Sequence, residues 1–279
     1  MRNKKILMRT VQTILAIGIT LIMLFPIYWM INTALKPSSE LLLPVPRFWP
    51  SQVDFGSFLM AWEKVPLGRY LFNTAFVTFW SLFFQIGTGI LAAYGFARGR
   101  FPGRDLLFLL VIGALMVPPQ VTFIPLYTLC SRLGWVNSFQ GLILPNTVSA
   151  YFIFMMRQAF MTVDQSYIDA GKLEGLGVLG VIRHIMVPMC RPTILTVALI
   201  SFVGSWNDYF WPKIITNKDE YRMIAVGLVR LYDVFGTNEI LENMNVVMSG
   251  ALISMVPILI LFVIFQKYML SGFTKASMK

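Results

Sequence analysis

The sequence predicts an all-α, polytopic membrane protein with six transmembrane helices, built as a single domain over residues 1–279. Hydrophobic residues make up 57% of the chain and charged residues 13%, whereas soluble domains average about 45–50% and about 25%. A transmembrane helix needs about 20 predominantly apolar residues. The sequence has six such runs, which leave too few residues for a soluble core of ordinary size. They are 10–35, 70–97, 106–130, 138–156, 192–212 and 244–266.

The basic residues are distributed unevenly between these runs. With the N-terminus inside, the inner segments hold 14 of the 23 Lys and Arg residues but only 4 of the 13 acidic ones. Basic residues accumulate on the cytoplasmic side of membrane proteins. We therefore expect both termini and the segment 164–191 in the cytoplasm. A nucleic-acid binder would gather its basic residues on one soluble face, so no nucleic-acid partner is expected.

The first run is too long for a signal peptide, whose apolar region spans about 7–15 residues, so we interpret 10–35 as the first span. The outer segment 36–69 is rich in proline and contains Trp49 and Trp62, which suit a membrane interface. It is either an interfacial loop or a contact for a binding protein. The second span, 70–97, leads into a short basic turn.

The third span is expected to break, because Pro118 and Pro119 fall inside it and proline removes a helical hydrogen bond. Broken helices at membrane depth are tolerated where they line a cavity. Gln120 is therefore a candidate for the substrate path, and an interhelical hydrogen bond is an equally good explanation. Asn146, in the fourth span, is a second candidate.

The segment 164–191 is the longest polar interval on the predicted inner side. Residues 165–173 have helical spacing around an acidic and small core, Asp169-Ala170-Gly171. An amphipathic helix on lipid headgroups would carry an aromatic-rich apolar face and a basic rim. Since this stretch has neither, docking into a cleft of a partner protein is the better interpretation.

The spacing from Asp169 through Glu174-Gly175 to Pro188 resembles the EAA loop of ABC-importer permeases. Two identities depart from that pattern: Asp169 stands for the usual Glu, and Gly171 for the second Ala. The resemblance implies the type I importer permease (MetI-like) fold and a coupling helix that docks on an ATPase. It assigns that coupling role to Tyr167, Asp169, Ala170, Gly171, Lys172, Glu174, Gly175 and Pro188.

The residues 206–212 and 247–249 resemble the carbohydrate-importing branch, in particular its smaller, maltose-type permease. This implies a bacterial or archaeal cytoplasmic membrane and a heterodimer with a second homologous permease. It also implies two ATPase subunits, which bind ATP and magnesium, and an extracellular binding protein. The implied cargo is a sugar or oligosaccharide, with glycerol 3-phosphate as the alternative in the same branch.

Two further groups are candidates for contact with the cargo or its carrier. Trp206, Asn207 and Asp208, near the end of the fifth span, are residue types that bind sugars, and they also suit a membrane interface. The outer segment 228–242 matches the loop that enters the binding protein in maltose importers, which implies contacts through Tyr232, Phe235 and Asn238. A merely solvated loop is the alternative.

The sequence predicts neither a catalytic site nor a cofactor or metal site in this chain. Gly175, Gly177 and Gly180 satisfy GxGxxG, but a dinucleotide site also needs a preceding strand and an acidic residue about 20 positions later. His184 is the only histidine, too few for a zinc site. A membrane-embedded transferase is the rival from another class, and it would need clustered polar residues at one membrane face.

Overall fold

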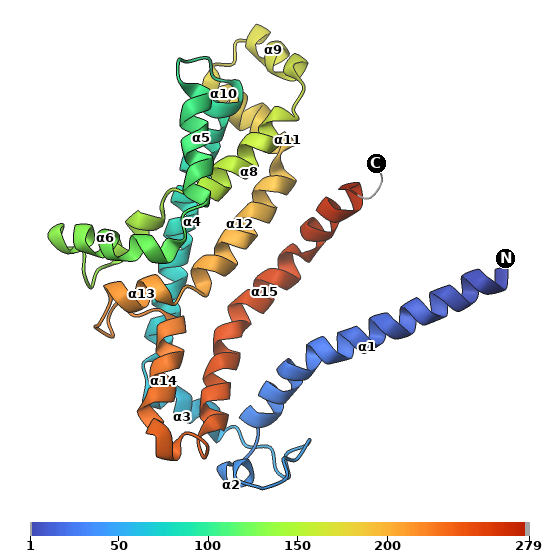
Figure 1. Ribbon diagram of the computed structural model, residues 1–279, viewed down its shortest axis with the longest axis vertical. Coiled ribbons are helices and arrows are strands. Elements are labelled where there is room, and N and C mark those ends of the chain that lie inside the picture. Colours follow the sequence, from blue (N-terminus) through green and yellow to red (C-terminus); the bar gives the residue numbers. More distant parts are fainter. Residues whose placement is uncertain (1, 277–279) are drawn as a thin grey trace. The chain divides into compact units, whose positions relative to one another are not determined.

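The structure, a computed structural model, describes residues 2–276, with side chains for 8–237 and 239–266. All regular elements within these residues are helical, which confirms the all-α prediction. The chain divides into two compact units, one from residues up to 68 and 227–256, the other from 69–226 and 257 onward. Figure 1 shows the helices of both units, and each unit is described by itself.

The first unit combines the N-terminal part of the chain, up to residue 68, with the later stretch 227–256. Its helices are α1 (Arg2–Ala34), α2 (Ser38–Leu41), α3 (Gly56–Lys64), most of α14 (Ile224–Glu239) and the first part of α15 (Met244–Ala276). Buried polar groups join these elements. Ser249 Oγ donates to Ser57 Oγ at 2.9 Å, Ser57 Oγ donates to the carbonyl of Ala34 at 2.6 Å, and Asn245 Nδ2 donates to the carbonyl of Lys36 at 2.9 Å. Because unpaired buried polar groups are costly, these bonds fix α15 against α1 and α3.

The second unit contains most of the remaining helices. They are α4 (Leu67–Arg98), α5 (Arg104–Leu115), α6 (Pro119–Arg132), α7 (Phe139–Ile143), η1 (Leu144–Asn146), α8 (Ala150–Met161), α9 (Gln165–Leu173), α10 (Val178–Val181), η2 (Ile182–Met186), α11 (Val187–Met189), α12 (Arg191–Trp206) and α13 (Phe210–Ile215). Figure 1 shows α9 and α10 at one end of this unit and α13 at the other.

The second unit has two apolar cores. One surrounds Phe152, Met156 and Phe160 of α8 and reaches Ala93 of α4 and Val197 of α12. The other brings α4, α6, α7 and α13 together around the buried side chains of Val77, Cys130, Leu142, Ile143, Trp211, Ile215 and Met223. The first core lies beneath α9 and α10, so it connects the 164–191 segment with the long helices.

Four helices within the described residues are long and apolar enough to cross a membrane: Met8–Ala34, Leu67–Arg98, Phe139–Met161 and Met244–Gln266. Two further spans result if each bent pair of helices counts as one. The break expected at the proline pair is present: α5 and α6 meet at 102°, and Pro119 is the first residue of α6. Proline suits this position because its missing N–H would have no helical partner there.

The fifth span departs from the sequence prediction at both ends. The apolar helix α12 ends at Trp206, and a separate helix, α13, begins at Phe210, so one helix over 192–212 is wrong. At its other end, α12 is bent by 82° from the helical stretch Val178–Met189. No proline or glycine marks the break at 207–209, and Asn207 closes α12 as its C-cap residue.

Candidate functional site

The helix α9 begins at a side-chain cap. The Asp164 carboxylate accepts a hydrogen bond from the backbone N–H of Ser166 at 2.8 Å. That bond, with help from the Ser166 hydroxyl, holds the pKa of Asp164 below its usual range. At the other end, Gly175 has φ 86°, a left-handed conformation that glycine adopts without strain. The sequence thus encodes both ends of a short, well-defined helix.

One face of α9 packs against the chain itself. Ile168 is buried in the core beneath the helix. Gly171 is buried too, and a Cβ there would lie 2.5 Å from Ile185 Cδ1 and 3.2 Å from Leu176 Cδ1. The small residue at 171 therefore serves internal packing.

The opposite face of α9 is open and apolar. Leu173 is 90% exposed, and Val178 and Leu179 in the adjoining α10 are 62% and 69% exposed. Tyr167 is 55% exposed as well, but it lies about 120° from Leu173 around α9. We call Leu173, Val178 and Leu179 the apolar patch. None of these three was predicted as a site residue. The exposure of Leu173 could have been predicted from its position in the helix. At about 100° per residue, Ile168 and Leu173 point to nearly opposite sides of α9, so one core cannot bury both.

The charged residues of α9 lie beside this patch. Asp169 is exposed, and its Oδ1 accepts from Gln165 Nε2 at 2.9 Å and lies 3.8 Å from Lys172 Nζ. The predicted coupling residues Ala170, Lys172 and Glu174 are exposed as well. Exposed ion pairs contribute little to stability, so a partner protein can replace the contact with Lys172 at little cost. The Asp169 carboxylate is therefore accessible to a partner.

The chain after α9 returns to the long helices through an unusual stretch. Residues Ile182–Met186 form a π-helix, η2, and Pro188 is exposed in α11 directly after it. Val181 and Met186 are buried in the same core as Ile168. Because α9, α10 and η2 share one core with α4, α8 and α12, the whole segment is packed onto the ends of long apolar helices.

No chemistry of catalysis or metal binding emerges in the described part of the chain. No group of three His, Cys, Asp or Glu side chains there lies together as a metal site. His184 is exposed, and its Nδ1 lies 3.1 Å from the carbonyl oxygen of Gly180 in its own segment. The three glycines that match GxGxxG lie in turns and short helices.

Comparison with known proteins decides the family. Residues 85–275 match the family described as "Binding-protein-dependent transport system inner membrane component". The chain belongs to this family. It is therefore a multi-pass inner-membrane permease subunit, whose general partners are an ATPase and a substrate-binding protein. Permease subunits of this kind carry no cofactor and are not enzymes, which removes the alternative of a membrane-embedded transferase.

Individual relatives cover nearly the whole permease. It is 30% identical to the arabinooligosaccharides transport system permease protein AraQ of Bacillus subtilis, over 97% of this chain and 96% of AraQ. It is 28% identical to the sn-glycerol-3-phosphate transport system permease protein UgpE of Yersinia pestis, over 92% of each chain. A crystal structure of a bacterial ABC transporter involved in alginate import shares its fold, with a TM-score of 0.85 at 21% identity over 96% of this chain and 98% of that one.

The substrate-path candidates of the permease lie on different elements of the second unit. Asn146 Nδ2 donates to the carbonyl of Leu142 at 3.0 Å, and Asn207 Nδ2 donates to that of Val203 at 3.0 Å, so both amides have a partner in their own segment. Gln120 is exposed in the first turn of α6, and Asp208 is half-buried between α12 and α13.

Trp206 lines an apolar hollow. The hollow has a volume of about 860 Å³ and lies in the second unit between side chains of α4, α12 and α15. Its aromatic residues are Phe72, Phe79, Phe83, Phe202 and Trp206. Rings of this kind suit an apolar ligand or a neighbouring helix as well as the face of a sugar.

The segment predicted as an outer loop at 228–242 is mostly helix. The helix α14 runs to Glu239 and is interrupted at Gly236, with φ 62°. Tyr232 is exposed. Phe235 is buried, with Lys64 Nζ 5.8 Å from its ring centre, so in this conformation it is not a surface contact. The side chain of Asn238 lies outside the described residues.

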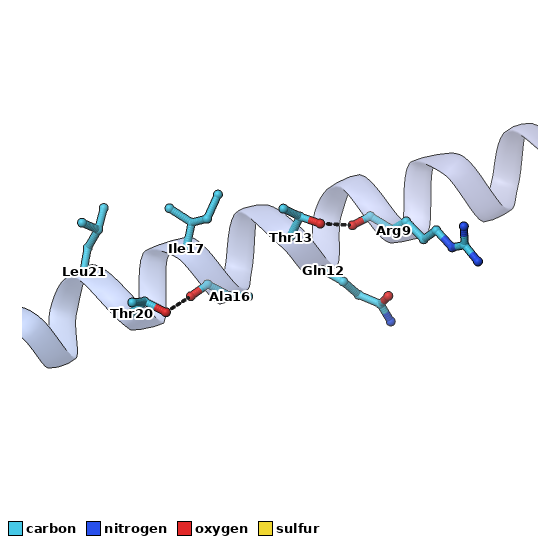
Figure 2. A pocket seen from close by; sticks show the side chains of 7 residues that line it. All are labelled: Arg9, Gln12, Thr13, Ala16, Ile17, Thr20 and Leu21. Carbon is cyan, nitrogen blue, oxygen red and sulfur yellow. Dashed lines mark hydrogen bonds between the residues drawn. The ribbon is translucent and has the colours of Figure 1, made fainter. Parts of the chain in front are cut away.

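One further polar stripe runs along the apolar helix α1. Figure 2 shows Arg9, Gln12, Thr13 and Thr20 on this stripe. The hydroxyls of Thr13 and Thr20 donate to the carbonyls of Arg9 and Ala16, at 2.9 and 2.8 Å. Because the helix itself satisfies both hydroxyls, Thr13, Ala16 and Thr20 present small side chains of the kind that allow close helix packing in membranes.

Proposed function

We propose that this permease translocates a sugar or oligosaccharide, which an extracellular binding protein delivers. The observation that carries the mechanism is the apolar patch: a large exposed leucine on a segment otherwise packed firmly onto the long helices. Patches of this kind mark protein–protein contacts. Docking of the patch on an ATPase explains both its exposure and the shared core beneath it, because that core lets a push on α9 move α4, α8 and α12.

The assembly that we propose has five subunit positions. This chain pairs with a second homologous permease, and two ATPase subunits bind ATP and Mg²⁺ on the cytoplasmic side. An extracellular binding protein contacts the outer side, with Tyr232 of this chain as a contact. Both termini and the segment 164–191 are cytoplasmic in a bacterial or archaeal membrane, as the excess of basic residues on that side supports.

The cargo proposal rests on the relatives and on charge. AraQ is named for arabinooligosaccharides, and the similar crystal structure is of an alginate importer. UgpE, named for sn-glycerol 3-phosphate, supports the alternative cargo. A phosphate group would call for basic residues along the path, and no Lys or Arg lies within the six predicted runs of this chain. We therefore favour a sugar or oligosaccharide over glycerol 3-phosphate.

The test is transport by the reconstituted complex. Proteoliposomes with ATP inside, and the transporter's own binding protein outside, should accumulate a labelled oligosaccharide and exclude labelled glycerol 3-phosphate. ATP hydrolysis should rise when the binding protein is loaded with that sugar. Accumulation of glycerol 3-phosphate alone would replace the sugar proposal with the alternative, and no uptake of either would contradict both.

A further inference from the structure

Arg98, the last residue of α4, lies where three helices meet. Its Nη2 donates to the carbonyl of Phe160, in the last turn of α8, at 2.9 Å and to the carbonyl of Val163, just after the helix. Its Nη1 donates to Gln165 Oε1 at 3.0 Å, in the first turn of α9. The carbonyls at a helix C-terminus carry partial negative charge, so a guanidinium is well suited to this place.

The hydrogen bonds continue from Arg98 along the exposed side of α9. Gln165 Nε2 donates to Asp169 Oδ1 at 2.9 Å. Arginine only donates and an ionised aspartate only accepts, so the amide between them has a single orientation that satisfies both. Arg98, Gln165 and Asp169 thus form a polar chain from the end of α4 to the carboxylate beside the apolar patch.

A second arginine provides a natural comparison within the same unit. Arg157 of α8 also donates to a backbone carbonyl, from Nε to Phe96 at 3.2 Å, and its guanidinium lies 3.9 Å from the ring centre of Phe108. Its contacts therefore join α8 to α4 and α5. They do not include α9. Only Arg98, of these two arginines, connects the long helices with the predicted coupling helix.

We propose that Arg98 and Gln165 are positioning residues of the coupling helix, which hold Asp169 in place and pass the displacement of α9 to α4. The inference rests on the proposed docking of α9 on the ATPase. The planar guanidinium fork suits this task, because it holds several acceptors in fixed directions, whereas the ammonium of lysine is a point charge on a flexible stem.

The experiment measures the coupling ratio, the number of cargo molecules imported per ATP hydrolysed, in proteoliposomes with equal amounts of assembled complex. Arg98→Lys keeps the charge and loses the fork. Gln165→Met removes the polar chain at an exposed position and leaves the bonds between α4 and α8 intact. We expect the ratio to fall at least about fivefold in both variants, the lower end of typical coupling effects between sites. Arg157→Lys is the matched control and should keep the wild-type ratio.

Each outcome bears on the proposal. A normal ratio in Gln165→Met, or an equal loss in Arg157→Lys, would overturn it, and the exposed glutamine keeps the test decisive if Arg98→Lys does not assemble. Failure of the proposed docking gives a different result: Leu173→Asp would then keep both ATPase association and uptake. A lowered ratio in Arg98→Lys and Gln165→Met with a normal Arg157→Lys supports the polar chain.

Discussion

Two polar segments of the second unit, 164–191 and 213–224, differ in what their side chains contact. Both interrupt apolar helices, and both carry several charges. In 213–224 the polar groups bind the chain itself. Asn73 Nδ2 donates to the carbonyls of Glu220 and Arg222, both at 2.9 Å, and Tyr70 Oη donates to Asp219 Oδ1 at 2.7 Å. The segment is thereby tied to the beginning of α4.

The segment 164–191 differs from 213–224 in the exposure of its large apolar side chains. Its apolar side chains divide between a buried set around Ile168 and the exposed apolar patch around Leu173. The number of charges therefore does not distinguish the internally bonded segment 213–224, which we call the brace, from a docking surface. The difference lies in whether large apolar side chains remain exposed on a helix that is otherwise firmly packed.

The largest expected difference between the two segments is their side of the membrane. Lys172 and Lys218 are both exposed, so a single cysteine at either position, in a background without Cys130 and Cys190, should react with a thiol reagent. In intact cells an impermeant reagent should label position 218 and leave position 172 unlabelled. Permeabilised cells, in which both should react, are the control. Labelling of position 172 from outside would reverse the topology.

The next effect concerns docking. Burial of a leucine side chain contributes about 1.5–3 kcal/mol, so loss of Leu173 alone should weaken ATPase binding about ten- to a hundredfold. Leu173→Asp adds a buried carboxylate, and we expect both co-purification with the ATPase and uptake to be lost.

The matched control for Leu173→Asp is Leu241→Asp. Leu241 is 62% exposed and lies between α14 and α15, in a segment predicted to be outside. The same substitution there should leave ATPase association unchanged. Equal loss in both variants would point to general misfolding, and no loss in Leu173→Asp would remove the distinction between brace and docking surface.

A smaller effect on stability is expected when hydrogen bonds to the segment 213–224 are removed. Asn137 Oδ1 accepts from the backbone N–H groups of Asn217 and Lys218, at 2.7 and 3.1 Å. Asn137→Ala leaves both donors unpaired in the fold and forces alanine into φ 54°, so about 1–3 kcal/mol of local stability should be lost. The melting temperature in detergent should fall by several degrees, while ATPase association persists.

The control for this variant keeps the acceptor. Asn137→Asp retains an oxygen for both N–H groups, and aspartate tolerates positive φ better than most residues. Its melting temperature should stay near that of the wild-type protein. If Asn137→Ala and Asn137→Asp melt alike, the two hydrogen bonds do not stabilise the segment.

The fold was largely predictable because a membrane span depends on local composition. The runs of apolar residues located the long helices, and the proline pair located the bend between α5 and α6. The break after Trp206 was missed because Asn207 closes α12 without proline or glycine. The helix α14 was missed because the nine charged residues over 213–242 suggested a solvated loop.

The candidate site was predicted less completely than the fold. The EAA-like spacing located α9, but it did not predict that Gly171 packs against Ile185, which is 14 positions away. The Arg98 contacts join residues 62 to 67 positions apart, and the local pattern of the sequence does not specify such pairs. The exposure of Leu173 could have been predicted, because a helical wheel places this residue nearly opposite Ile168.

The smallest expected effect is the pH dependence of the α9 cap. The pKa of Asp164 is lowered in the folded state, first by the Ser166 N–H. A depressed pKa means that the cap stabilises the fold above the unfolded pKa, about 3.9 for aspartate, and that this contribution disappears as the pH falls through the lower, folded pKa. Asp164→Asn also caps helices and does not titrate. The wild-type complex should therefore melt slightly above Asp164→Asn at pH 7, and the gap should close as the pH is lowered past about 4. A gap that stays constant over this range would show that the ionised carboxylate of Asp164 contributes nothing beyond the neutral cap.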